Sequence, residues 1–438
     1  MPTAATPLAR RSLLRDAALL GGGALLSGLP LGYGRALARP ATAPRAYSNV
    51  AALIERYVGS RKLPGMVATL GSGRAPPQVI ARGLEGFTDR DPVTLDSLFR
   101  IYSMTKPVTG MAAMILIDEG KLGLDQPLAE ILPRFARMRV QVTPDGPLAD
   151  LRPAKTAITI RHLLTHTAGL AYPIVQRGPI KAAYEAAGLA PYSFSRLPIP
   201  GLERGRAAPS LAAFADRLAE QPLVYEPGTR WSYSVGLDLM GRVIEVVSGQ
   251  AFGAFLAERF FAPLGMSRTF FQIPPGETRR LTANYAILGG VPVPIDLPDS
   301  TIFAAKPPFP FGGAGLVSSP RDYDRFLAML AGYGAIDGKR VMSERAVRLG
   351  TSNLLPPGVS TVGTMVDGHG FGAGGRVGVG ELAGTYGWAG AAGTIGFVHL
   401  PQRLRAALYA QFMPVATYPV HRDFPLAVLA DLRAMAEA

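Results

Sequence analysis

The sequence predicts one large domain of mixed α and β structure in which a mainly helical segment interrupts a sheet. Residues 66–70 and 78–82 have the pattern of a β-hairpin around a Gly-Ser-Gly turn. Strand character returns only near the end of the chain, at residues 393–400 and 403–411. Between about residues 111 and 310 the pattern is mostly that of helices and loops. We therefore expect the first and last segments to complete one sheet together.

The length and composition of the chain support this expectation. A chain of 438 residues is long enough for one large domain or two interlocked ones, and hydrophobic and charged fractions of 48% and 18% are those of a globular protein. The formal net charge of +13 comes mostly from scattered arginines. Because no basic stripe is interleaved with aromatic residues, we expect no nucleic acid as a partner. Cysteine is absent, which excludes disulfides and thiolate catalysis but does not identify a compartment.

Residues 1–38 have the pattern of a cleaved export signal. The twin arginine Arg10-Arg11 precedes an apolar stretch at residues 17–31, and a small-residue cleavage site ends at Ala38. A twin arginine is typical of the Tat export system. The alternative is an N-terminal membrane anchor, but the apolar stretch is too short to span a bilayer and contains glycines and a proline. We therefore expect a periplasmic or secreted mature domain, residues 39–438, with no stable membrane anchor.

Between its two ends, the chain is predicted to alternate helices with long connections. Two connections, at residues 171–209 and 272–312, are rich in proline and glycine and have the length and composition of active-site rims. The predicted helices cover residues 47–58, 106–119, 125–132, 160–164, 210–220, 234–247, 252–261 and 427–436.

The stretch with the clearest chemistry is Ser103-Met104-Thr105-Lys106, at the start of the helix that Gly120 ends. A serine and a lysine three residues apart share one helix face, which brings the amine within reach of the hydroxyl. A serine hydroxyl needs a neighbouring base to take its proton, and lysine serves only when burial or positive charge lowers its pKa. The helix N-terminus also favours negative charge developing on an oxygen. The bare spacing is weak evidence, so the argument depends on the apolar helix around it.

Two later stretches have the composition of parts of such a site. Tyr233 falls in a tight loop just before a predicted helix, where a nearby lysine cation would lower its pKa and let it shuttle a proton. Alone, such a tyrosine is more often a packed aromatic residue. The small residues around Trp388, at residues 386–394, allow a ligand to approach the backbone, although a tight edge strand has the same composition.

Other functional motifs are missing or incomplete. The sequence contains no G-x-S-x-G nucleophile elbow and no G-x-x-x-x-G-K-[ST] phosphate loop. The glycines at residues 368–375 are typical of strand-edge and loop backbone rather than of a dinucleotide site. His162 and His166 have the spacing of a zinc motif, but Leu163 stands where H-E-x-x-H needs an acid, so we expect no metal site.

Taken in order, the motifs resemble those of the serine β-lactamase and penicillin-binding superfamily. The chain is most similar to the β-lactamase-related esterases of family VIII, which are themselves similar to class C β-lactamases, and the resemblance runs from about residue 47 to the C-terminus. Phrases at residues 162–170, 226–228 and 313–316 also match recurrent family phrases. The three main matches are Ser103-Met104-Thr105-Lys106, Tyr233-Ser234-Val235 in place of Y-x-N, and Trp388-Ala389-Gly390 in place of K-T-G.

The resemblance implies an α+β fold of the β-lactamase/transpeptidase type, with an antiparallel sheet flanked by helices and an inserted, mainly helical domain. This arrangement agrees with the order of the predicted segments. The sheet subdomain would then span about residues 47–110 and 311–438, and the helical subdomain about residues 111–310.

The resemblance also assigns roles within the site. It implies that Ser103 is the nucleophile and that Lys106 with Tyr233 forms the general base and acid. The backbone N–H groups of Ser103 and Ala391 would form the oxyanion hole, and no cofactor or metal is implied.

Two departures from the family motifs affect the expected substrate. Val235 replaces the asparagine of Y-x-N, and Trp388 replaces the lysine of K-T-G, with Ala389 and Gly390 completing the substrate-binding strand. Both departures make β-lactam or peptide turnover less expected. The resulting prediction is a secreted serine hydrolase of small-molecule carboxylic esters. The alternatives are a class C-like β-lactamase, a D-amino-acid peptidase, an acyltransferase, and a non-catalytic envelope-binding protein.

Overall fold

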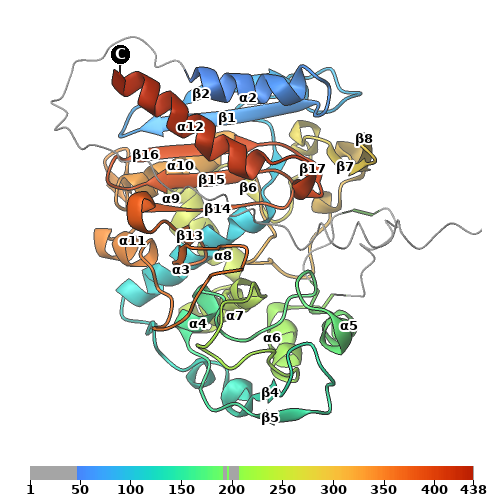
Figure 1. The fold of residues 1–438 in the computed structure, drawn as a ribbon, viewed down its shortest axis with the longest axis vertical. Helices are drawn as coiled ribbons and strands as arrows, with labels where there is room; N and C mark the ends of the chain where they lie inside the picture. The colour runs from blue at the N-terminus through green and yellow to red at the C-terminus, as the bar shows by residue number, and fades with distance from the viewer. Residues whose placement is uncertain (1–46, 191–194, 197–206, 438) are drawn as a thin grey trace, which may run out of the picture.

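The computed structural model describes residues 47–190, 195–196 and 207–437, so the expected export signal at residues 1–38 lies outside the described ranges. An antiparallel sheet with helices on both faces forms one part of the molecule, and a mainly helical region lies below it in Figure 1. This is the β-lactamase/transpeptidase-like α+β fold that the sequence predicts.

The main sheet joins the two ends of the chain. Its order is β12-β13-β14-β15-β16-β1-β2, and every neighbouring pair is antiparallel. β1 pairs with β2 in the predicted hairpin, and also with β16, where Val67 lies opposite Tyr409. The prediction of one sheet built from both ends is therefore confirmed. The strands are β1 Gly65–Ser72, β2 Gln78–Gly83, β12 Gly370–Phe371, β13 Arg376–Val377, β14 Thr385–Ala389, β15 Ile395–His399 and β16 Leu404–Tyr409.

Helices cover both faces of this sheet (Figure 1). α2 and α12 share an apolar core with one face, where the rings of Phe397 and Phe424 lie 6.0 Å apart, and α10 and α3 belong to the core on the other face. Among the described residues no single helix has the length and hydropathy of a membrane span. The helical segments 236–248 and 252–264 have that length and hydropathy only when they are taken together, and they are bent by 82° relative to each other. The helices are α2 Ser48–Val58, α3 Thr105–Asp118, α4 Ile160–Leu164, α5 Gly178–Ala186, α6 Leu211–Ala219, α7 Gly236–Ser248, α8 Phe252–Leu256, α9 Ala262–Leu264, α10 Pro320–Ala331, α11 Glu344–Gly350 and α12 Val420–Glu437.

In the part of the chain that the structure describes, the other strands form four smaller sheets, of which the β4–β5 pair lies in the helical region at the bottom of Figure 1. Two of these sheets have three strands, in the orders β17-β7-β8 and β3-β9-β6, and two have only a pair. The strands are β3 Phe99–Arg100, β4 Arg139–Gln141, β5 Leu151–Pro153, β6 Thr269–Phe270, β7 Asn284–Leu288, β8 Val291–Asp296, β9 Val317–Ser318, β10 Ala335–Ile336, β11 Lys339–Arg340 and β17 Phe412–Met413.

The segment at residues 272–312 differs from the expected open connection, because it contains the β7–β8 hairpin. Its turn is Gly289-Gly290, with φ of 58° and 86°, as a two-residue turn with two left-handed positions requires. β8 contains two prolines, which lack the N–H that a ladder needs, and it lies at the edge of its sheet where that loss is tolerated. The hairpin therefore adds sheet structure within the range expected to be mainly helical.

The helix that starts with the S-x-x-K motif is buried on all sides. Every residue of α3 from Thr105 to Leu116 is buried, and the chain leaves the helix at Gly120, with φ of 69°. Glycines let the loop after β12 approach the helix closely: a Cβ on Gly110 would lie 2.0 Å from the Ala373 carbonyl oxygen, and one on Gly374 would lie 2.4 Å from that of Lys106. Gly110 and Gly374 thus allow the loop after β12 to pack directly against the first turns of α3.

A buried ion pair fixes the strand that leads to Ser103. Arg100 on β3 is fully buried, and its Nε donates to the Asp296 carboxylate at 2.7 Å. Its Nη1 donates to the Thr282 carbonyl at 2.6 Å and to Gln411 Oε1 at 3.1 Å. The guanidinium therefore ties β3 to the end of β8 and to the segment before β17.

Asp296→Ala is expected to lower the free energy of unfolding by about 3–5 kcal/mol, because it leaves the Arg100 charge buried without its partner. Denaturant titration followed by tryptophan fluorescence measures the loss. The matched control is Glu220→Ala, which breaks the ion pair with Arg134, where both side chains are more than half exposed, and should cost at most about 1 kcal/mol. Equal losses in the two variants would contradict the anchoring role of Arg100.

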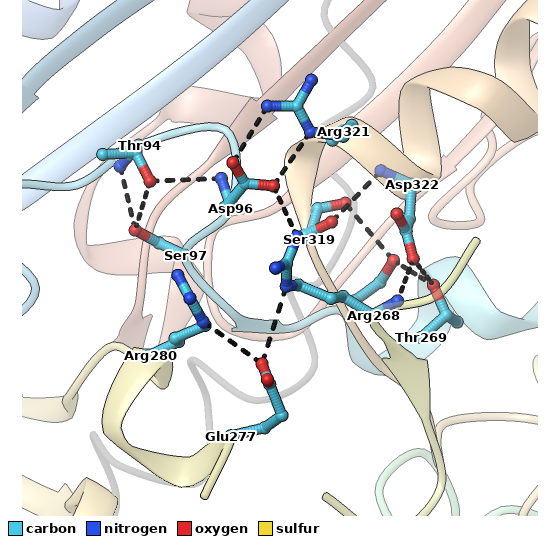
Figure 2. Close-up of polar contacts among 11 residues, drawn as sticks. Thr94, Asp96, Ser97, Arg268, Thr269, Glu277, Arg280, Ser319, Arg321 and Asp322 are labelled. Carbon is cyan, nitrogen blue, oxygen red and sulfur yellow. Dashed lines mark hydrogen bonds and ion pairs between the residues drawn. The ribbon is translucent and has the colours of Figure 1, made fainter. Parts of the chain in front are cut away.

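A second polar cluster connects segments at the outer edge of β3 (Figure 2). Asp96, in the loop before β3, accepts hydrogen bonds at 2.9 Å from Arg321 at the start of α10 and from Arg268. The hydrogen bond from Arg321 is the main reason that the pKa of Asp96 is lowered. Arg268 and Arg280 also form ion pairs with Glu277. This cluster fastens the loop that leads into β3 to α10.

Candidate active site

The nucleophile candidate stands at a strained entry to α3. A single 3-10 turn, Tyr102–Met104, joins β3 to the helix, and Tyr102 has φ of 41°. A bulky residue rarely adopts a left-handed conformation, so the surrounding packing must hold it there. Ser103 is partly exposed, whereas Lys106 one turn later is fully buried. The turn thus presents the hydroxyl at the surface of the site and the amine beneath it.

Lys106 contacts the serine, a carbonyl oxygen and two aromatic rings. Its Nζ donates to Ser103 Oγ at 3.3 Å and to the Gly313 carbonyl oxygen at 2.6 Å. The same nitrogen lies 4.6 Å from the ring centre of Tyr233 and 5.5 Å from that of Tyr172, within the range of cation–π attraction. These contacts fix the amine beside the serine hydroxyl, as the S-x-x-K spacing predicts.

A buried acid, Asp238, is hydrogen-bonded to Gly313. Asp238, in the first turn of α7, accepts a hydrogen bond from the Gly313 N–H at 2.9 Å, while the carbonyl of the same residue accepts from Lys106. Burial raises the pKa of Asp238, and the Lys106 charge and the Gly313 N–H oppose that rise. A Cβ on Gly313 would lie 2.5 Å from Asp238 Oδ2, so glycine is required at this close approach. One residue, Gly313, therefore links the carboxyl group to the lysine through its N–H and its carbonyl oxygen.

Tyr233 completes a polar chain that ends at the serine. Its hydroxyl donates to Ser103 Oγ at 2.8 Å and accepts from Trp388 Nε1 at 3.2 Å. Because the indole N–H is a donor only, the tyrosine oxygen is the acceptor in that contact, and the same oxygen lies within hydrogen-bonding distance of the serine. We expected Trp388 to line the substrate site, and the structure shows that it also contacts the tyrosine hydroxyl.

The other expected site residues surround this chain. Val235 is buried as the N-cap of α7, and its N–H donates to the Ala171 carbonyl at 3.3 Å. Because its side chain is a hydrocarbon, this position does not supply the amide of the family asparagine. Ala389 ends β14, and a Cβ on Gly390 would lie 2.4 Å from the Ile101 carbonyl oxygen. The turn that carries Ala391 therefore packs directly against the segment that carries Ser103.

The two expected oxyanion donors are both unpaired. Among the described residues, neither the N–H of Ser103 nor that of Ala391 donates a hydrogen bond to another part of the chain. Ala391 is partly exposed, as is Ser103. Both groups are thus able to donate to an oxygen of a bound molecule.

The two histidines of the candidate zinc spacing have separate roles. His162 caps the start of α4, where its Nδ1 accepts from the Thr159 N–H at 3.2 Å, and burial lowers its pKa to about 4. His166 is fully buried, and its Nδ1 lies 3.0 Å from Ser234 Oγ. The described residues contain no group of three or more histidines and acids that could hold a metal ion.

Two residues at the site were missed as functional candidates from the sequence. The signal for Asp238 was available, since a lone acid on the apolar face of a helix directly after the tyrosine motif is rarely buried without a partner. His166 belongs to one of the family phrases, but nothing in the sequence shows which side chain it contacts.

The antiparallel sheet, the helical region beside it and the contacts of Ser103 with Lys106 and Tyr233 define a protein of the β-lactamase/transpeptidase-like class. A family model described as Beta-lactamase matches residues 50–429, and the chain therefore belongs to the β-lactamase family. This confirms the resemblance found in the sequence motifs.

Several relatives of this chain are known. Protein Rv1367c of Mycobacterium tuberculosis is 38% identical over 274 residues, which cover 62% of this chain and 63% of the relative. Esterase EstB of Burkholderia gladioli is 30% identical over 296 residues, which cover 63% and 68% of the two chains. Among solved structures, EstCE1, described as a hydrolase with promiscuous acyltransferase activity, has a TM-score of 0.69 and 25% identity, covering 87% of this chain and 97% of its own. The match to the mycobacterial relative thus spans less than two thirds of that protein.

Proposed function

We propose that this protein hydrolyses small carboxylic esters through an acyl-enzyme formed on Ser103. The observation that carries the proposal is the set of contacts at the serine oxygen, with the Tyr233 hydroxyl at 2.8 Å and the Lys106 amine at 3.3 Å. A serine with a base system in direct contact is the arrangement needed for nucleophilic catalysis. Membership of a family that includes esterase EstB supports the same assignment.

In the first half of the proposed reaction, the Tyr233 and Lys106 pair takes the proton from Ser103 as Oγ attacks the ester carbonyl carbon. The N–H groups of Ser103 and Ala391 would stabilise the resulting oxyanion, each lowering the barrier by about 3–4 kcal/mol. The carbon–oxygen bond to the alcohol then breaks, and the pair returns the proton to the leaving oxygen. The alcohol departs and the acyl group remains on Oγ.

In the second half, water replaces the alcohol. The same pair takes a proton from the water as its oxygen attacks the acyl carbon, and the bond from that carbon to Oγ breaks. The proton passes to Oγ, which restores the serine hydroxyl, and a carboxylic acid leaves. No cofactor enters either half of this proposal.

The residues at the end of β14 favour an uncharged substrate. β-Lactams and D-alanyl peptides carry a carboxylate beside the scissile bond, and the lysine and threonine of K-T-G offer that anion a cation and a hydroxyl. Here Trp388 and Ala389 stand in those positions, both partly exposed. A lost charge-assisted hydrogen bond corresponds to about 1.5–3 kcal/mol, or about 10- to 150-fold in kcat/KM. The indole also provides a flat apolar wall for an acyl or alcohol group.

We expect clear turnover of p-nitrophenyl butyrate and slow or no turnover of a chromogenic cephalosporin. Trp388→Lys should reduce the difference between the kcat/KM values for the two substrates. The ratio of the two kcat/KM values is the measurement. Trp388→Phe is the matched control, because it removes the hydrogen bond to Tyr233 but keeps an apolar wall. It should lower both rates and leave their ratio nearly unchanged. A wild-type protein that hydrolyses the cephalosporin at least as efficiently as the ester is a β-lactamase or peptidase instead.

A second candidate is acyl transfer, since the proposed acyl-enzyme is able to react with an alcohol in place of water. The similarity to EstCE1, described as a hydrolase with promiscuous acyltransferase activity, favours it. Incubating the protein with p-nitrophenyl butyrate and butanol distinguishes the two outcomes. Butyl butyrate detected by gas chromatography, and absent with Ser103→Ala, supports transfer, whereas butyric acid alone supports hydrolysis.

We also propose that the protein is exported, and the sequence of residues 1–38 is the support for it. Cell fractionation of the full chain tests the proposal. Export should fail when Arg10 and Arg11 are both replaced by lysine, and unchanged export would remove the twin-arginine assignment.

A further inference from the structure

His166 contacts the loop that carries Tyr233 on both sides of the tyrosine. Its carbonyl oxygen accepts from the Ser232 N–H at 2.9 Å, and its ring Nδ1 accepts from the Ser234 N–H at 3.2 Å. These two donors belong to the residues directly before and after Tyr233. One histidine therefore accepts hydrogen bonds from the backbone N–H groups on either side of the tyrosine that contacts Ser103.

The His166 side chain also packs against the tyrosine itself. Its ring centre lies 4.7 Å from that of Tyr233, and the rings of Trp231 and Phe371 enclose it at 5.9 and 5.3 Å. The imidazole is fully buried in this aromatic cluster. The ring thus restricts the tyrosine side chain as well as its backbone.

The hydrogen bonds define the protonation state of His166. Because Nδ1 accepts from the Ser234 N–H, it carries no hydrogen, and the Ser234 hydroxyl at 3.0 Å donates to the same atom. This assignment places the ring hydrogen on Nε2, which is buried and has no hydrogen-bond partner among the described residues. Burial, and to a lesser degree the charge of Lys106, hold the pKa of His166 well below its usual value, which keeps the ring neutral. The histidine therefore presents an acceptor and not a charge.

The backbone of His166 explains which residue fits this position. Its φ is 58°, in the left-handed region, where histidine, asparagine and aspartate occur several times more often than other side chains. The conformation directs the ring toward the tyrosine loop directly after α4 ends. Asparagine is the closest replacement, since it tolerates the same backbone and carries an amide oxygen at the distance of Nδ1 from the main chain.

We propose that His166 is a positioning residue that holds the Tyr233 hydroxyl at hydrogen-bonding distance from Ser103, using its neutral ring as a clamp on the tyrosine loop. The proposal rests on the proposed function, because it acts through the proton transfer that Tyr233 performs there. His166 itself does not touch the reacting atoms.

The test compares His166→Gly and His166→Asn in two backgrounds, wild type and Tyr233→Phe. Both replacements suit the left-handed backbone, and only asparagine keeps an acceptor. His166→Gly should lower kcat for p-nitrophenyl butyrate by about 10- to 100-fold, the range expected when a reacting group is displaced by about an ångström. KM should change little, and His166→Asn should recover most of the loss. In the Tyr233→Phe background the same glycine replacement should cost less than about threefold, since its target hydroxyl is already gone.

Two results would overturn the proposal. One is an equal loss of kcat in both backgrounds, which would indicate a general effect on folding, and the other is an asparagine variant no better than the glycine variant. If His166→Gly does not fold, as judged by near-UV circular dichroism, Ser234→Ala removes one partner of Nδ1 and should show a smaller loss that again vanishes with Tyr233→Phe. Failure of the proposed function is distinguishable, because Ser103→Ala would then retain full hydrolysis whatever the His166 variants do.

Discussion

Ser103→Ala is expected to lower kcat for p-nitrophenyl butyrate by at least about 1,000-fold, a lower bound, because loss of the nucleophile from a serine hydrolase can cost about a million-fold. The reason is geometric, since the contacts of Tyr233 and Lys106 converge on this one oxygen. Without it, the base pair has no nucleophile to activate and no acyl-enzyme forms. Steady-state kinetics with purified protein measure the effect.

The matched control for this variant is Ser72→Ala. Ser72 is exposed at the end of β1, on the sheet rather than at the site, and its replacement should leave kcat unchanged. Hydrolysis that survives in Ser103→Ala would assign the activity to another group and contradict the role of Ser103 as the nucleophile.

Lys106→Ala and Tyr233→Phe are each expected to lower kcat by at least about 100-fold, which is within the range for loss of a positioned base. Both side chains contact Ser103 Oγ, and the Lys106 amine lies 4.6 Å from the Tyr233 ring centre, so they act as one unit. The double variant should therefore be little worse than the poorer single one. Kinetics of the three variants at the pH optimum of the wild type provide the comparison.

Lys121→Ala is the control for the lysine replacement. Lys121 follows α3 and pairs at the surface with Glu119, with more than half of its side chain exposed, so its loss should not affect kcat. Losses that multiply in the Lys106 and Tyr233 double variant would mean that the two residues act independently, and the proposed proton transfer through the pair would need revision.

The parts of the fold that follow from local pattern were predictable. The β1–β2 hairpin, the position of Ser103 at the start of α3 and the end of that helix at Gly120 each depend on residues close in sequence. That the first and last segments share one sheet also followed from the order of the strand-like segments, whereas the particular pairing of β1 with β16 is known only from the structure. The structure also brings Ser103, Tyr233 and Trp388 together, as the resemblance of the three motifs to those of the family implied.

The parts that depend on contacts through space were not predictable. The β7–β8 hairpin was missed because Pro292 and Pro294 suggest a loop, although the Gly289-Gly290 pair is a hairpin signal in its own right. The contact of the Trp388 indole with the tyrosine hydroxyl depends on side-chain geometry across 155 residues of sequence separation. For the same reason, the link from Asp238 through Gly313 to the lysine becomes visible only in the structure.

The most direct test of the central claim is the identity of the residue that becomes covalently modified. The wild-type protein should react with a fluorophosphonate probe, and mass spectrometry of its peptides should find one added probe mass on the peptide that contains Ser103. Ser103→Ala should remain unlabelled. A label on any other peptide, or labelling that persists in Ser103→Ala, would contradict the assignment of Ser103 as the nucleophile.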